Sequence, residues 1–69
     1  MKPKYLRFDD GIIMISVINA IYKELHNDYP NIRIEYGNTY YEEYIATYKT
    51  ERERDAAFDE ILAAIDGGE

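Results

Sequence analysis

Apolar and polar side chains alternate in several short segments before the C-terminal part of the chain, and this alternation predicts strands. Near the N-terminus Leu6 and Phe8 fall on one face of such a strand, and Tyr5 and Arg7 fall on the other. The Asp-Asp-Gly segment at residues 9–11 predicts a turn, because Asp and Gly tolerate left-handed backbone. The β-branched apolar run that follows predicts the second strand of a hairpin.

The clearest alternation lies at residues 32–36, where apolar and charged residues take turns. Residues 26–31 predict a loop, because Pro30 disfavours helical backbone at the residue before it and Asn and Asp form local turns. A Gly-Asn pair predicts the next reversal, and the tyrosine-rich residues 40–49 predict the last strand. Both faces of this strand carry apolar side chains, so we expect something other than water to cover one of them.

Residues 16–25 fit two structures. A helix here would have Ser16 as a possible N-cap, and its apolar face would consist of Val17, Ile18, Ile21 and Leu25. Its apolar residues are mainly β-branched or aromatic, so we interpret residues 19–25 as a strand. The helical alternative would leave the sheet with fewer strands and would add a second covering helix.

The segment after Thr50 predicts a capped amphipathic helix. Thr50 and Glu53 fit the capping box, and Glu51 lies in the first turn, where the helix dipole favours an anion. Two glycines, Gly67 and Gly68, end the helix in the usual way. The apolar residues follow the i, i+3, i+4, i+7 spacing of a helix face: Phe58, Ile61, Leu62 and Ile65.

These signals predict a single α+β domain, in which a small antiparallel β-meander of three to five strands is covered by the C-terminal amphipathic helix. We expect the domain to span residues 1–69, with a helix over 51–66 and strands over residues 4–9, 12–17, 19–25, 32–36 and 40–49. The expected core consists of Leu6, Phe8, Ile32, Ile34, Phe58, Ile61, Leu62 and Ile65.

The order of these signals resembles a type of small bacterial and phage domain of obscure function. That pattern is a strand, Asp-Gly, Ile-Ile, two or three further strands, and then Thr-x-x-Glu-Arg with a short helix. The matching segments are residues 8–13, 18–22, 32–34 and 48–61. The resemblance implies a β-meander with a C-terminal helix and supports the strand interpretation of residues 19–25. It implies no catalytic residues.

Composition narrows the classes of function. The chain has 69 residues, a net charge of -6 and no cysteine. The negative charge disfavours nucleic acid and anionic membranes as direct partners, and the lack of cysteine excludes disulfides and thiolate metal sites. We see no signal peptide or membrane anchor and expect a cytoplasmic protein. The charge itself fits two interpretations, namely solubility of a small domain or a surface that meets a basic partner.

No pattern of residues predicts catalysis, so we expect no enzyme, no metal site and no cofactor. His26 is the only histidine, and a metal site needs several convergent ligands. Ser16, His26 and Asp28 include the residue types of a catalytic triad, but no nucleophile motif surrounds the serine. The paired carboxylates at residues 9–10 and 42–43 are adjacent in sequence, and adjacent residues of a strand point to opposite faces.

The remaining candidate is a surface of tyrosines and carboxylates. Tyrosine supplies a large contact area at low entropic cost, so these residues predict either an interface or a strand that completes a thin core. The candidate interface is Tyr36, Tyr40, Tyr41, Glu42, Glu43 and Tyr44. The candidate acidic surface adds Asp9, Asp10 and Glu35.

Two hypotheses of function follow. The first is a non-enzymatic protein-interaction module that forms a homodimer through the strand at residues 40–48 and so covers an exposed edge. The second is a phage-type inhibitor of a host defence or nucleic-acid-binding protein, whose carboxylates mimic nucleic-acid charge. A small-ligand binder at a dimer interface is a third class, disfavoured by the size and the negative charge of the chain.

Overall fold

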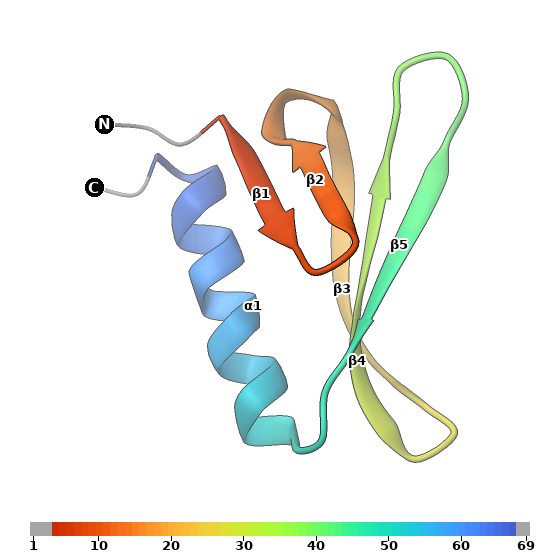
Figure 1. Cartoon of the computed structure of the whole chain (residues 1–69), viewed down its shortest axis with the longest axis vertical. Helices are drawn as coiled ribbons and strands as arrows, with labels where there is room; N and C mark the ends of the chain where they lie inside the picture. Colours follow the sequence, from red (N-terminus) through yellow and green to blue (C-terminus); the bar gives the residue numbers. More distant parts are fainter. Residues whose placement is uncertain (1–3, 68–69) are drawn as a thin grey trace.

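A computed structural model of the chain describes residues 4–67 and shows an α+β fold of five strands and one C-terminal helix. The strands form two antiparallel sheets, a β1–β2 hairpin and a three-stranded β3–β4–β5 meander with β4 in the centre (Figure 1). The elements in chain order are β1 (Tyr5–Phe8), β2 (Gly11–Met14), a 3-10 turn (Ile15–Val17), β3 (Ile18–His26), β4 (Tyr29–Tyr36), β5 (Glu42–Thr47) and α1 (Glu51–Ile65).

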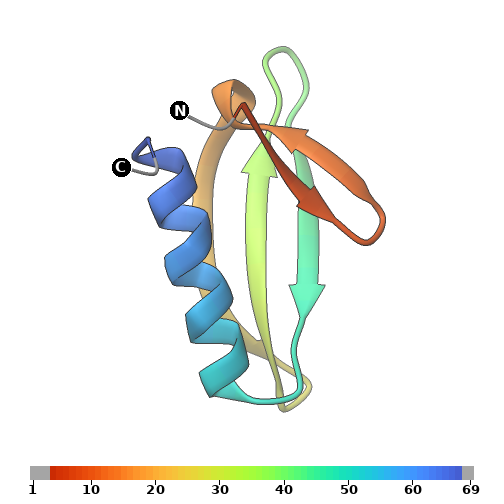
Figure 2. The ribbon, with the colours of Figure 1, turned by 60° about the vertical axis from the view of Figure 1, so that its left-hand side comes forward.

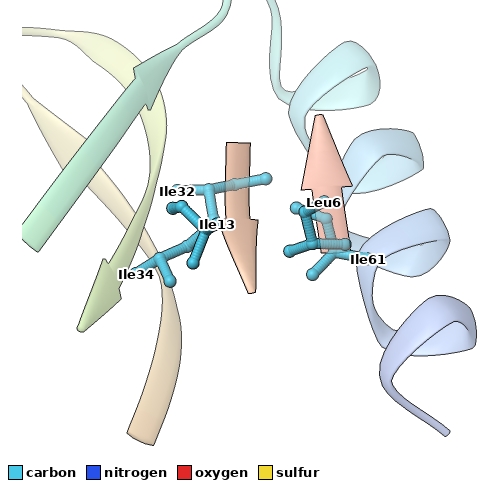
Figure 3. Close-up of a cluster of buried hydrophobic side chains, with 5 residues drawn as sticks. All are labelled: Leu6, Ile13, Ile32, Ile34 and Ile61. Carbon is cyan, nitrogen blue, oxygen red and sulfur yellow. The ribbon is translucent and has the colours of Figure 1, made fainter. Parts of the chain in front are cut away.

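The molecule has two layers. The hairpin and α1 lie side by side against one face of the three-stranded sheet and leave its other face uncovered by residues 4–67 (Figures 1 and 2). Leu6 and Ile13 are directly opposite each other in the hairpin and point inward. They meet Ile32 and Ile34 of β4 and Ile61 of α1, and these five buried side chains form the core (Figure 3). Ile13 is a core residue that the sequence analysis missed.

The helix begins and ends almost where the sequence predicts. The Thr50 Oγ1 atom accepts a hydrogen bond from the Glu53 N–H at 3.1 Å, which is the predicted N-cap. At the other end Gly67 has a φ of 111° and donates to the Ala64 carbonyl; Gly68 lies outside the described residues. Phe58 and Ile65 are partly buried against the core.

One predicted core residue is wrong. Leu62 is 39% exposed, because α1 packs with the small side chains of Ala57 and Ala64 toward the core. This orientation of α1 buries Ile61 in the core, and successive residues of a helix are about 100° apart, so Leu62 points toward solvent.

The predicted strand over residues 12–17 is correct only in its first half. The strand ends at Met14, and Ile15–Val17 form a 3-10 turn that carries the chain from the hairpin layer to the sheet. The Val17 carbonyl accepts from the Gly37 N–H at 2.9 Å, which ties this crossing to the far end of β4. The five strands therefore form two sheets rather than one continuous meander. The ambiguous segment that follows is strand β3, not a helix.

The predicted loop at residues 26–31 is a two-residue turn. Asn27 and Asp28 have φ values of 52° and 67°, the left-handed pair that a tight hairpin turn requires. The strand β4 therefore starts already at Tyr29 and includes Pro30. Proline lacks an N–H donor, and it is tolerated here because the ladder between β4 and β5 ends at this residue. The last bond of that ladder is donated by the Tyr48 N–H to the Pro30 carbonyl, at 2.9 Å.

The strand β5 is shorter than predicted, since residues 40 and 41 belong to the connection before it. That connection is tight at Gly37, which has a φ of 122°. A Cβ atom at this glycine would collide with the Tyr40 carbonyl. The fold thus holds Tyr40 and Tyr41 off the sheet, where they are 81% and 77% exposed.

Candidate functional site

The predicted interface residues do not form one surface. Tyr36 and Tyr44 lie on the inner face of the sheet and are partly buried against the core. Tyr40 and Tyr41 project from the β4–β5 connection. Glu42 and Glu43 are exposed at the start of β5, where the Tyr36 hydroxyl donates to the Glu42 carboxylate at 3.4 Å. Most of these residues belong to the strand β5 or to the connection that precedes it.

The free edge of β5 carries unpaired backbone groups. The two-residue turn makes His26 and Tyr29 a hydrogen-bonded pair of the β3–β4 ladder. Because the backbone groups of successive residues point to opposite sides of a strand, the odd-numbered residues of β4 bond to β3 and the even-numbered residues bond to β5. In β5 the matching even-numbered residues bond back to β4. The N–H and C=O groups of Glu43, Ile45 and Thr47 therefore point away from the sheet, and within residues 4–67 no hydrogen bond engages them.

The opposite edge of the same sheet, β3, is protected. It has a bulge between Ile18 and Ala20, and Lys23 lies 5.2 Å from the centre of the Phe58 ring of α1. The side chain of Arg54 also anchors α1 to this strand, because its Nη1 atom donates to the Glu24 carbonyl at 2.8 Å. Bulges, lysines and covering elements are the usual devices that stop a strand edge from pairing with another chain. The six residues of β5 include no lysine or proline, and its pairing with β4 shows no bulge.

A groove of about 400 Å³ runs along this unprotected edge. It is formed because the turn of the β1–β2 hairpin stands over β5 and projects past it (Figure 2). The rings of Phe8 and Tyr44 pack together there, with their centres 4.7 Å apart. The lining residues are Arg7, Phe8, Asp9, Asp10, Tyr44, Ile45, Ala46, Thr47 and Tyr48.

The groove combines aromatic walls with an acidic rim. Burial raises the pKa of Tyr44 above its ordinary value of 10.0, and the nearby carboxylates of Asp10 and Asp9 raise it further. Burial likewise raises the pKa of Tyr48, with contributions from Glu60 and Asp9. Both tyrosines thus keep neutral hydroxyls beside negative charge. Asp9 and Asp10, predicted as part of an acidic surface, lie at this groove.

The outer face of the sheet is organised around Arg33. Its guanidinium lies 4.3 Å from the centre of the Tyr22 ring, pairs with Glu24 at 2.8 Å and also pairs with Glu35. The hydrogen bond from Arg33 is the main cause that lowers the pKa of Glu24. Ile45 lies directly opposite Arg33 and is 52% exposed, so this face offers an apolar side chain beside neutralised charges.

The predicted acidic surface is divided by the fold. Glu35 and Glu43 are opposite each other on the outer face, and Arg33 neutralises the first of them. Asp9 and Asp10 belong to the other layer.

Of the three residues with the types of a catalytic triad, the serine lies at the opposite end of β3 from the histidine and the aspartate. Ser16 is in the 3-10 turn before β3, whereas His26 ends β3 and Asp28 is in the turn after it. Among residues 4–67 no three side chains of His, Cys, Asp or Glu gather closely enough to hold a metal ion. Asn31 is 2% exposed and its Oδ1 atom has no partner in the described part of the chain, but it lies between Glu24 and Thr47 in the sheet rather than in the groove.

No protein-family model matches the chain, and neither a curated protein sequence nor a solved structure matches it. None of the helices within residues 4–67 combines the length and the apolar character needed to cross a membrane.

Proposed function

We propose that this protein is a small non-enzymatic protein-interaction module that binds its partner through the free edge of β5. The observation that supports this function is the unprotected edge itself, with free backbone groups at Glu43, Ile45 and Thr47. An extended segment of another chain would add to the sheet as a further strand. In this mode the backbone hydrogen bonds supply affinity, and the grooves for alternate side chains supply specificity.

A second copy of the chain is one occupant of this edge, as the homodimer hypothesis expects. Two β5 strands related by a two-fold axis would turn the same face of their sheets to the same side. Each copy would then bring its Asp9–Asp10 turn to one seam, between chains that each have a net charge of -6. We therefore propose that the main partner is a different protein rather than a second copy of this chain. No observation favours the nucleic-acid mimic.

The substitution Ile45→Pro tests the proposed function. Proline removes the outward N–H of residue 45 but no bond of the β4–β5 ladder, so the domain should stay folded. Ile45→Thr is the matched control, because it shortens the same side chain and keeps the N–H. In affinity capture from cells that express the protein, we expect partners to be retained by the wild type and by Ile45→Thr and to be lost with Ile45→Pro.

Circular dichroism and an NMR spectrum of Ile45→Pro must show the wild-type fold for this comparison to apply. If Ile45→Pro is misfolded, Ile45→Lys replaces it, since a lysine on an edge strand also opposes pairing. Equal capture by the folded edge variant and the wild type would refute the β5 edge as the binding site.

A further inference from the structure

The hairpin turn determines which side chains an added strand can carry. Successive side chains of a strand point to opposite faces. Every second side chain of a segment paired with β5 would therefore enter the groove beneath the turn, beside Tyr44 and Ala46. The side chains between them would lie on the outer face beside Ile45.

The groove side selects for positive charge. The turn presents two exposed carboxylates, Asp9 and Asp10, and within residues 4–67 no cation pairs with either of them. The opposite charge in the lining is Arg7, whose guanidinium lies 5.9 Å from the centre of the Tyr5 ring on its own strand. Glu60 adds negative charge near Tyr48. The balance at the groove is therefore acidic.

The aromatic lining of the groove suits a long basic side chain. Phe8, Tyr44 and Tyr48 provide aromatic walls between the sheet and the acidic turn. The methylene stem of a lysine or arginine would pack on these rings while its charged end reaches the carboxylates. On the outer face the half-exposed Ile45 favours a β-branched apolar neighbour.

We propose that the segment bound by β5 is an extended strand of a partner protein with lysine or arginine at alternate positions and β-branched apolar residues between them. This inference rests on the proposed function of the β5 edge and names the chemistry of its partner. A second β5 strand fits this pattern poorly, because its groove-facing residues would be Tyr44, Ala46 and Tyr48, with no basic side chain among them.

The test uses the full chain, labelled with 15N, and the blocked peptide Lys-Val-Lys-Val-Lys-Val-Lys as the probe. We expect NMR shifts at residues 43–47 and 9–10, with a dissociation constant of about 1 mM or tighter. The variant D9N/D10N should bind at least about fivefold more weakly, because two ion pairs are lost. The control D59N/D66N changes the net charge equally but alters exposed residues of α1 and its C-cap, so its affinity should stay within about twofold of wild type.

Two control peptides separate charge from backbone pairing. The same peptide with N-methylated valines has the same charge but cannot complete the ladder, and a Glu-Val repeat keeps the alternation with the opposite charge. We expect neither to bind at about 5 mM. Binding of the N-methylated peptide at the affinity of the parent would show nonspecific charge attraction and would overturn the inference.

The failure of this inference and the failure of the proposed function give different results. If D9N/D10N binds the Lys-Val peptide as tightly as wild type while Ile45→Pro does not bind it, the edge is the site and the basic specificity is wrong. If the wild type does not bind the Lys-Val peptide, the basic partner is refuted but the β5 edge is not. The same holds if the wild type forms a dimer that Ile45→Pro dissociates. Binding that Ile45→Pro does not weaken refutes both.

Discussion

At the scale of single residues, the outer face of the sheet depends on one arginine. Among the described residues Arg33 is the only cation that pairs with the carboxylates of Glu24 and Glu35, and these carboxylates share the face with Glu43. Without Arg33 the directly opposed Glu35 and Glu43 would repel each other across the ladder. The arginine therefore offsets the repulsion among the carboxylates of this face.

This arrangement predicts a loss of stability in acid. Hydrogen bonding by Arg33 lowers the pKa of Glu24 below its ordinary value of 4.5 in the folded chain. The stabilisation is fully present at a pH above 4.5 and is lost as the pH falls through the lower folded value. Glu24→Gln should therefore be less stable than wild type near neutral pH, and the difference should disappear in acid. Urea unfolding at several pH values measures this, with Asp59→Asn as the control.

A constant difference between Glu24→Gln and wild type across the whole pH range would contradict this account, because it would show that the glutamate stabilises the fold through contacts that do not depend on its charge.

At the scale of elements, local chemistry decides how well the sequence predicts each segment. The helix was predictable because its cap, its apolar spacing and its terminal glycine all lie within one short segment. The break after Met14 was not, because Ile15–Val17 are as apolar as the strand before them and only the packing of the two layers makes them turn. Asn27 and Asp28 were recognised as turn formers, but Pro30 made the loop look longer than it is.

Loss of the N-cap of α1 should destabilise the domain. Replacing Thr50 with alanine removes the acceptor of the Glu53 N–H, and such caps contribute about 1 kcal/mol. For a domain of this length the loss corresponds to a fall in Tm of about 4–8 °C. Thermal unfolding followed by circular dichroism measures it, with Thr39→Ala in the exposed β4–β5 connection as the control. If Thr50→Ala lowers the Tm no more than Thr39→Ala does, the cap does not contribute to stability.

At the scale of the whole molecule, the candidate site arises from topology. Asp9 and Asp10 were recognisable as acidic from the sequence, and the strand near residue 44 was recognisable as a possible edge. Their meeting at one groove depends on the hairpin crossing the sheet as a separate layer, which no local pattern specifies. The outward direction of the Ile45 backbone likewise depends on the two-residue turn between β3 and β4. Tyr40 and Tyr41 were included in the predicted interface because the segment is rich in tyrosine, but they lie in the connection before β5 and not on its free edge.

The strand β5 has one paired side and one free side, and residue-resolved amide hydrogen exchange by NMR tests this most directly. In the free protein the amides of Tyr44 and Ala46 should exchange slowly and those of Glu43, Ile45 and Thr47 should exchange fast. Addition of the Lys-Val peptide should slow the three fast amides and leave the two slow ones unchanged. Slow exchange at Glu43, Ile45 and Thr47 in the free monomer, or no slowing when the peptide binds, would contradict the claim that this edge is the binding surface.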